Sequence, residues 1–115
     1  YMLVNEVRLI GNLVKDVNVP TALRIAGEKK VLNFVVAINI GYGDTAKTQF
    51  IDCMAWQKQA EYLNKYGTKG SRIELVGHLQ KRSYEKDGST VYVTEVVVDE
   101  CHVIAKQRMD QTEAE

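Results

Sequence analysis

Two runs near the end of the chain limit the possible folds more than any other part of the sequence. Residues 72–80 alternate apolar and polar side chains, and residues 91–105 form a second, longer strand-like run. Asp87-Gly88 lies between them, and this dipeptide is the strongest short signal for a β-hairpin when strands flank it. The pattern predicts a projecting hairpin and a chain built mainly from sheet.

One helical run and several strand-like runs precede this hairpin. Residues 57–66 carry apolar side chains near helical spacing and are followed by Gly67, which predicts one short helix. The strand-like runs are β-branched or alternating, and turn residues separate them. They cover residues 3–14, 31–40 and 48–56, with a further short extended piece at 22–26.

The order of these elements predicts an all-β OB-fold. This fold is a five-stranded, partly open barrel that commonly binds oligonucleotides or oligosaccharides. Here the short helix comes between the third and fourth strands, and the hairpin projects between the fourth and fifth. A chain of 115 residues suits one domain. We expect that domain to span residues 2–105, and we expect the polar residues 106–115 to form a disordered tail.

The third strand raises the question of function. Side chains alternate along a strand, so Phe50, Asp52 and Trp56 share one side. The opposite side, with Cys53 and Ala55, is small and apolar, as a core face should be. The chain therefore places its single Trp and one of its two Phe beside a carboxylate, away from the predicted core. Phe34 differs, since it shares its parity with apolar neighbours and is expected in the core.

Two more rings lie outside the expected core. Tyr42 sits between two glycines at a strand end, and Tyr84 lies among charges in the arm of the hairpin. Exposed rings can stack on any base, and each stack contributes about 1–3 kcal/mol in proteins that hold single strands. The four candidate stacking residues are Tyr42, Phe50, Trp56 and Tyr84. By pattern alone, the same rings could instead cover sheet edges or fill an oligomer interface.

The cations are spread among the rings. Because 15 basic residues balance 15 acidic residues, attraction of a polyanion has to come from local clustering. Lys47 and Lys58 flank the third strand, and Lys81 and Arg82 precede Tyr84. The candidate phosphate contacts are Lys47, Lys58, Lys69, Lys81 and Arg82.

Nothing in the sequence suggests catalysis. His78 and His102 have no carboxylate or cysteine at ligand spacing, so we expect no enzymatic activity, no metal and no cofactor. Cys53 and Cys101 lie outside any CxxC pattern and are expected to be buried, free thiols. No run approaches the ~18 apolar residues of a membrane span, and no signal segment is recognisable. We therefore expect a cytoplasmic protein.

The residues also resemble a known family. The segments NEVRLIGNLVKD, LNFVVAIN, FIDCMAWQKQAEYLNKYGTKGSRIELVGHLQKRSYE and VYVTEVVVD, taken together, are similar to the bacterial and phage single-stranded DNA-binding proteins over about residues 3–105. The resemblance implies an OB-fold homotetramer that coats single-stranded DNA during replication, recombination and repair. Family stacking positions match the four rings above, and phosphate-contact positions match Lys58, Lys69 and Arg82.

The resemblance leaves some points open. This chain stops at DQTEAE, without the acidic, Phe-ended tip by which the family recruits replication and repair enzymes, so the resemblance does not extend to those partners. It does imply a nucleoid-associated protein, or one in the host cytoplasm if phage-encoded. The alternatives are an OB-fold that binds structured RNA or oligosaccharide, and a pure assembly subunit.

Overall fold

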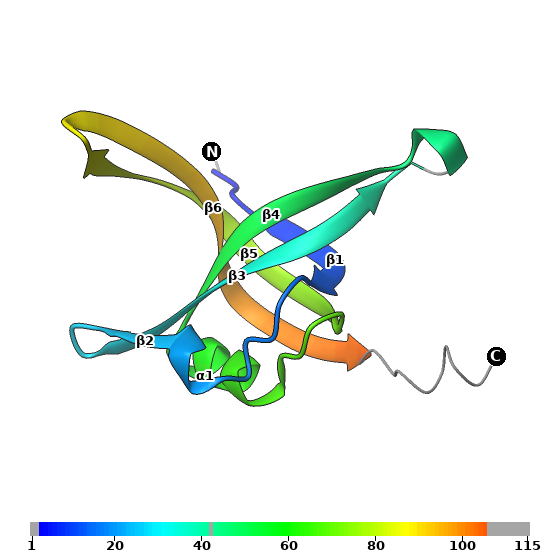
Figure 1. Ribbon diagram of the computed structural model, residues 1–115, viewed down its shortest axis with the longest axis horizontal. Coiled ribbons are helices and arrows are strands. Elements are labelled where there is room, and N and C mark those ends of the chain that lie inside the picture. The colour runs from blue at the N-terminus through cyan, green and yellow to red at the C-terminus, as the bar shows by residue number, and fades with distance from the viewer. Residues whose placement is uncertain (1–2, 42, 106–115) are drawn as a thin grey trace.

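A computed structural model describes residues 3–41 and 43–105 of the chain. Strands dominate it, and one α-helix interrupts them (Figure 1). Tyr42 and the expected tail at 106–115 lie outside the described residues. The main elements are β1 (Val7–Leu13), β2 (Leu23–Ala26), β3 (Lys29–Ile40), β4 (Lys47–Trp56), α1 (Gln57–Tyr66), β5 (Arg72–Lys86) and β6 (Ser89–Ala105). Two short 3-10 turns cover Pro20–Ala22 and Gly43–Thr45.

Five of the strands close into a barrel. The sheet order is β1-β5-β6-β4-β3-β2, and a further pairing between β1 and β3 completes the circle. All pairings are antiparallel except β4 with β6, which are parallel. The sixth strand, β2, only extends β3 at one edge. The predicted five-stranded OB-fold, with its helix before β5, is confirmed.

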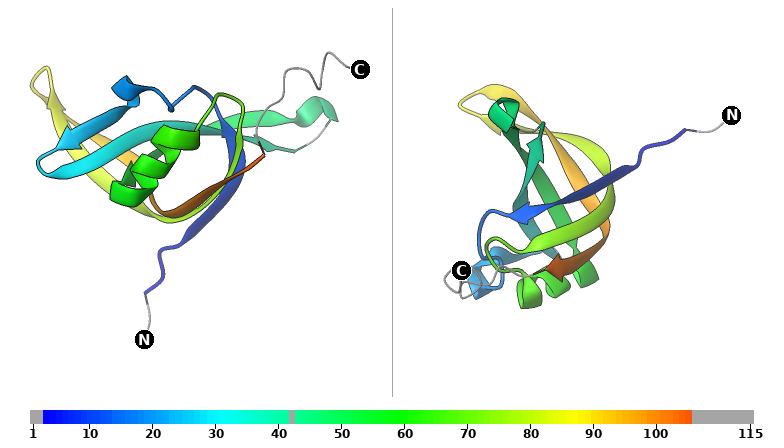
Figure 2. Two further views of the ribbon diagram at one scale, coloured as in Figure 1. Left: turned by 90° about the horizontal axis from the view of Figure 1, so that it is seen from below. Right: turned by 90° about the vertical axis from the view of Figure 1, so that its right-hand side faces the viewer.

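Two long hairpins, β5–β6 and β3–β4, project from the barrel. The β5–β6 ladder runs without interruption from the barrel to Lys86↔Ser89, where Asp87 and Gly88 both take positive φ angles. Two such residues are what a two-residue hairpin turn requires. The β3–β4 hairpin leaves the barrel in another direction (Figures 1 and 2).

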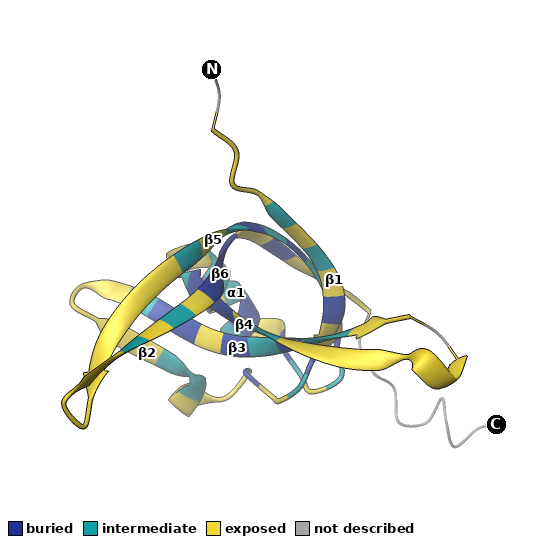
Figure 3. Cartoon of the chain, turned by 90° about the horizontal axis from the view of Figure 1, so that it is seen from above, coloured by how far each residue is buried: buried dark blue, intermediate teal, exposed yellow. Residues whose placement is uncertain are grey.

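The core follows the alternation of the strands. Leu32, Phe34 and Val36 of β3 point inward and are buried, as are Cys53 and Ala55 of β4. Figure 3 shows burial concentrated in the barrel, with both hairpin arms exposed. Leu79 has the same parity as the buried Ile73 and Leu75, but it is exposed because β5 extends beyond its pairing with β1 there.

The helix closes one end of the barrel. Its Ala60 and Leu63 are fully buried against the core, and its bounds match the predicted helix at 57–66. Tyr62 packs beside them, and its hydroxyl accepts a hydrogen bond from the Val103 backbone N–H at 2.9 Å. The helix therefore supports the barrel at this end.

Both cysteines are free and buried, as predicted. Burial raises the pKa of Cys53 and of Cys101 from 9.0 to about 12. Both thiols therefore stay protonated at neutral pH and behave as small apolar side chains. Among the described residues, no helix combines the length and the apolar character needed to cross a membrane.

Two glycines permit close approach of neighbouring strands. A Cβ on Gly11 would overlap Val36 and the Ala37 carbonyl oxygen, where β1 turns toward β3 to close the barrel. A Cβ on Gly77 would overlap the Val97 carbonyl oxygen, beside an irregularity in the β5–β6 register between Val76 and Gly77. Gly11 therefore lies where the barrel closes.

Substituting Gly77→Ala is expected to reduce the free energy of unfolding by about 3 kcal/mol or more, because the obstructing atom belongs to the backbone. Gly27→Ala is the control: its φ of +67° is strained for alanine, but open space surrounds it, so a loss of only ~1–2 kcal/mol is expected. Urea denaturation measures both. Equal losses would contradict the packing argument.

Candidate nucleic-acid interface

Strand register brings three of the predicted rings to one face of the sheet. Paired residues on neighbouring strands point to the same side. Phe50 and Trp56 share the side of Met54, and Met54 pairs with Val97 of β6. From Val97 the alternation along β6 leads to Val91, which pairs with Tyr84 of β5. We call this side of strands β3, β4, β6 and β5, turned away from the core, the outer face.

The three rings differ in exposure. Phe50 is 66% exposed and Tyr84 42%, whereas Trp56 is half-buried at the start of the helix. Phe34, expected in the core, is only 6% exposed. The rings on the outer face therefore offer planar surface to a ligand, and Phe34 does not. Tyr42 lies outside the described residues, so its place among the stacking residues stays a prediction.

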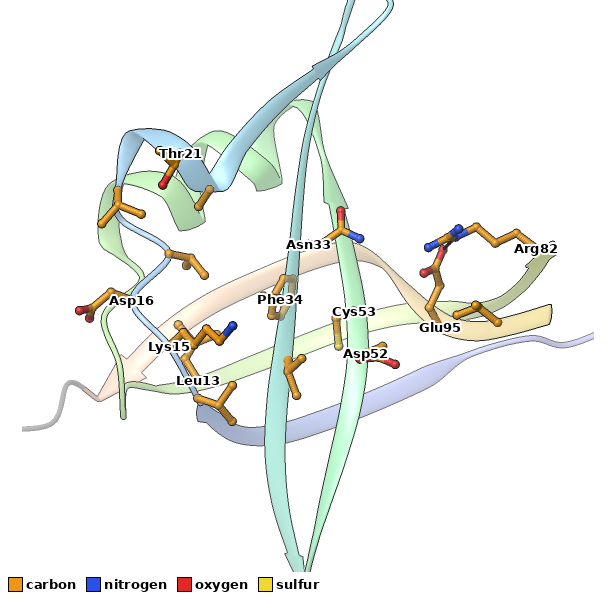
Figure 4. A pocket seen from close by; sticks show the side chains of 16 residues that line it. Leu13, Lys15, Asp16, Thr21, Asn33, Phe34, Asp52, Cys53, Arg82 and Glu95 are labelled. Atoms are coloured by element: carbon orange, nitrogen blue, oxygen red, sulfur yellow. Dashed lines mark hydrogen bonds and ion pairs between the residues drawn. The ribbon is translucent and has the colours of Figure 1, made fainter. Parts of the chain in front are cut away.

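A groove of about 470 Å³ lies between the loop at residues 13–22 and the β5–β6 hairpin (Figure 4). The loop at residues 13–22 forms one wall, the central parts of β3 and β4 form the floor, and the base of the β5–β6 hairpin forms the other wall. OB-folds bind oligonucleotides and oligosaccharides on the equivalent strand face, between the equivalent loops. The polar residues that line the groove are Lys15, Asp16, Thr21, Asn33, Asp52, Arg82 and Glu95.

Of the five cations predicted to contact phosphate, Arg82 lies on the outer face. It pairs with Val93, two residues from Tyr84 along β5, and lines the groove. Its Nε donates a hydrogen bond to Oε2 of the buried Glu95 at 2.9 Å. This hydrogen bond, with the charge of Glu95, raises the pKa of Arg82. The guanidinium is thus firmly charged and held beside the groove.

The four predicted lysines lie elsewhere. Lys47 pairs with Ile40 and points to the opposite side from Phe50, at the far end of the β3–β4 hairpin. Lys81 also points away from the outer face, with its Nζ 5.1 Å from the ring centre of Tyr92. Lys58 lies in the first turn of the helix, and Lys69 lies in the following loop, where its backbone N–H donates to Asp16. The structure does not gather these lysines around the rings, and their contact with phosphate stays a prediction.

Sequence reasoning missed a second arginine on the outer face. Arg24 of β2 pairs with Val31, and Val31 pairs in turn with Trp56, so the three residues form one row across the sheet. The Arg24 Nη2 donates a hydrogen bond to Asn33 Oδ1 at 2.9 Å, and Asn33 lines the groove. The only sequence signal for Arg24 was the short extended piece at residues 22–26. The sequence did not indicate which strand this piece pairs with.

The histidines correct one expectation. Each does contact a carboxylate: His78 Nδ1 lies 3.2 Å from Asp99, and His102 Nε2 lies 2.8 Å from Glu100. Sequence spacing could not show the first contact because it joins two strands. In the part of the chain that the structure describes, no three His, Cys, Asp or Glu residues group in a way that could hold a metal ion.

Comparison with known proteins agrees with this geometry. The model of the single-strand binding protein family matches residues 4–104. Single-stranded DNA-binding protein 4 of Streptococcus agalactiae is 37% identical over 91% of this chain and 77% of its own length. Single-stranded DNA-binding protein 1 of Streptococcus pyogenes is 35% identical over 91% and 82%. The single-stranded DNA-binding protein of Oceanobacillus iheyensis is 38% identical over 84% and 61%.

Proposed function

Because the chain belongs to the single-strand binding protein family, we propose that it binds single-stranded DNA without sequence preference and coats the strand during replication, recombination and repair. The observation that carries this proposal is the set of rings on the outer face, beside a groove that contains Arg82. The protein acts by binding alone and needs no cofactor. It works in the bacterial cytoplasm, or in that of a phage host.

Bases stack on Phe50, Trp56 and Tyr84, with Tyr42 as a further predicted platform. A ring stacks on any base, so this contact carries no sequence information. The phosphates follow Lys15 and Arg82, which line the groove, and Arg24, which is hydrogen-bonded to the groove residue Asn33. The four predicted lysines lie off this path. They contact phosphates where the DNA continues around the barrel. These residues are Lys47, Lys58, Lys69 and Lys81.

The alternatives fit the geometry less well. Phe50 is too exposed to be a packing residue of this chain, so a purely structural role requires another subunit to cover it. An oligosaccharide site could use the rings, but it would not need the arginines beside them. Double-helical RNA is read mainly through its shape and its 2′-hydroxyl groups, and its paired bases offer no free face to the rings.

Anisotropy of a fluorescently labelled oligo-dT tests this function. We expect saturable binding to oligo-dT and oligo-dC, and much weaker binding to a duplex of the same length, because paired bases cannot reach the rings. Binding should weaken with salt, at a logarithmic slope of about −0.7 for each phosphate contacted. Equal affinity for the duplex, or a salt-independent affinity, would contradict the proposal.

We further propose that four chains assemble through β1. Val7–Gly11 of this strand pair with β5 on one side only, since the pairing with β3 is confined to Asn12 and Leu13. An unpaired strand edge is a ready site for another chain. Ile10 lies on this strand and Leu3 and Val4 just before it, and all three are exposed apolar residues. The segment before β1 extends away from the barrel (Figure 2). A second copy of β1 would satisfy this edge and cover them.

Light scattering is expected to give about 52 kDa, four times the 13.0 kDa chain. Ile10→Asp should lower this mass, because a charge would enter the apolar contact. Ile25→Asp is the matched control, because Ile25 is the same residue type and is also exposed, but it lies on β2. A monomeric wild type, or dissociation caused by the control alone, would contradict assembly through β1.

A further inference from the structure

Glu95 is a buried carboxylate on the surface proposed to bind a polyanion. It is only 3% exposed, yet it lines the groove beside the β5–β6 hairpin (Figure 4). A carboxylate is costly to bury unless charged or hydrogen-bonding groups compensate it. At first sight a negative charge here should also repel the phosphates of a bound strand. Its presence in the groove therefore needs a physical reason.

The partners of Glu95 supply this reason. Its Oε2 accepts one hydrogen bond from Arg82 Nε at 2.9 Å and another from Gln80 Nε2 at 3.1 Å. Gln80 lies directly opposite Glu95 in the β5–β6 ladder, and Arg82 is one step further along the same side of β5. Because the ladder is regular between these residues, the two contacts fix the carboxylate firmly.

Arg82 uses only part of its guanidinium in this contact. Nε binds Glu95, while the two terminal nitrogens carry four N–H donors that have no hydrogen-bond partner among the described residues. The side chain is exposed and borders the groove. A planar guanidinium that is held at Nε presents its remaining donors in a fixed geometry, which suits two-point binding of a phosphate.

We propose that Glu95 is a positioning residue for single-stranded DNA: it holds the Arg82 guanidinium at Nε so that the free N–H groups face a backbone phosphate in the groove. This inference rests on the proposed function. The carboxylate does not touch the DNA, and its benefit is a lower entropic cost when Arg82 binds the phosphate.

The sign of the effect separates positioning from simple charge. Charge alone predicts that removing any carboxylate from the groove tightens the binding of a polyanion. Asp52 provides the matched control because it lies on the same outer face and lines the same groove. Within the described ranges, Asp52 makes no hydrogen bond and no ion pair. Asp52→Ala should therefore bind oligo-dT as tightly as the wild type or more tightly.

Glu95→Ala is expected to weaken binding to labelled oligo-dT about tenfold, although it makes the protein more positive. Glu95→Gln should restore most of the affinity, because the amide oxygen still accepts from Arg82 Nε. In an Arg82→Ala background, Glu95→Ala should cause no further weakening, since the residue acts through Arg82. Anisotropy at one salt concentration compares all variants, and circular dichroism confirms that each is folded.

Arg82→Lys tests the same idea without touching the buried residue. Lysine keeps the charge but cannot be held at Nε while offering a planar pair of donors. Positioning predicts an affinity close to that of Arg82→Ala, and charge alone predicts an affinity close to that of the wild type. Wild-type affinity in Arg82→Lys, or tighter binding in Glu95→Ala, would overturn the inference. Failure of the wild type to bind oligo-dT would instead overturn the proposed function.

Discussion

Replacing Phe34 by alanine is expected to lower the free energy of unfolding by about 3–5 kcal/mol. Phe34 is 6% exposed and belongs to the buried cluster that fills the barrel. Removing its ring leaves a cavity that Leu32 and Val36, held in the same strand, cannot easily fill. Urea denaturation measures the loss, and a variant that is largely unfolded at room temperature would agree with the upper end of this range.

Phe50→Ala is the matched substitution on the outer face. Phe50 is 66% exposed, so the stability should stay within about 0.5 kcal/mol of the wild type. Its affinity for oligo-dT should fall by about 1–3 kcal/mol, as expected when one stacked base is lost. The same change of residue should thus affect stability at one position and binding at the other. Equal losses of stability at both positions would contradict the division between core and outer face.

Removing the three described rings together should have the largest effect on binding. If each stack contributes about 1–3 kcal/mol, the triple variant Phe50→Ala, Trp56→Ala, Tyr84→Ala should bind oligo-dT at least about 100-fold more weakly. The salt dependence should change little, because the rings carry no charge. Anisotropy of labelled oligo-dT measures both quantities.

Tyr92→Ala provides the control for the triple variant. Tyr92 is 65% exposed, but it pairs with Ser83 and therefore points away from the outer face. Its loss should change the affinity much less than the loss of any outer-face ring. If Tyr92→Ala weakened binding as much as Phe50→Ala, exposure alone would explain the effects, and the outer face would not be the binding surface.

The fold could be predicted from the sequence because its signals are local. The alternation in β3 and β4 separates core residues from surface residues, and the 57–66 run has helical spacing followed by Gly67. Asp87-Gly88 supplies the positive φ angles of the β5–β6 turn. The extent of β5 beyond residue 80 was less clear, because the hairpin arm is exposed on both sides and loses the apolar alternation.

The site could be predicted only within single strands. Phe50 and Trp56 were placed together correctly because they lie on one strand. Residues three apart on a strand point to opposite sides. This rule places Lys47 on the opposite side from Phe50, and Lys81 on the opposite side from Tyr84, so the sequence could have excluded both lysines from the outer face. Arg24 and Glu95 could not be found, because their positions depend on which strands pair and in which register.

Trp56 offers the most direct test of the central claim, because it is the chain's single Trp and lies on the outer face. Its fluorescence should be quenched as oligo-dT is added, and the quenching should saturate at the stoichiometry at which anisotropy shows binding to be complete. Oligo-dT that binds fully while the emission of Trp56 stays unchanged would contradict base stacking on this surface.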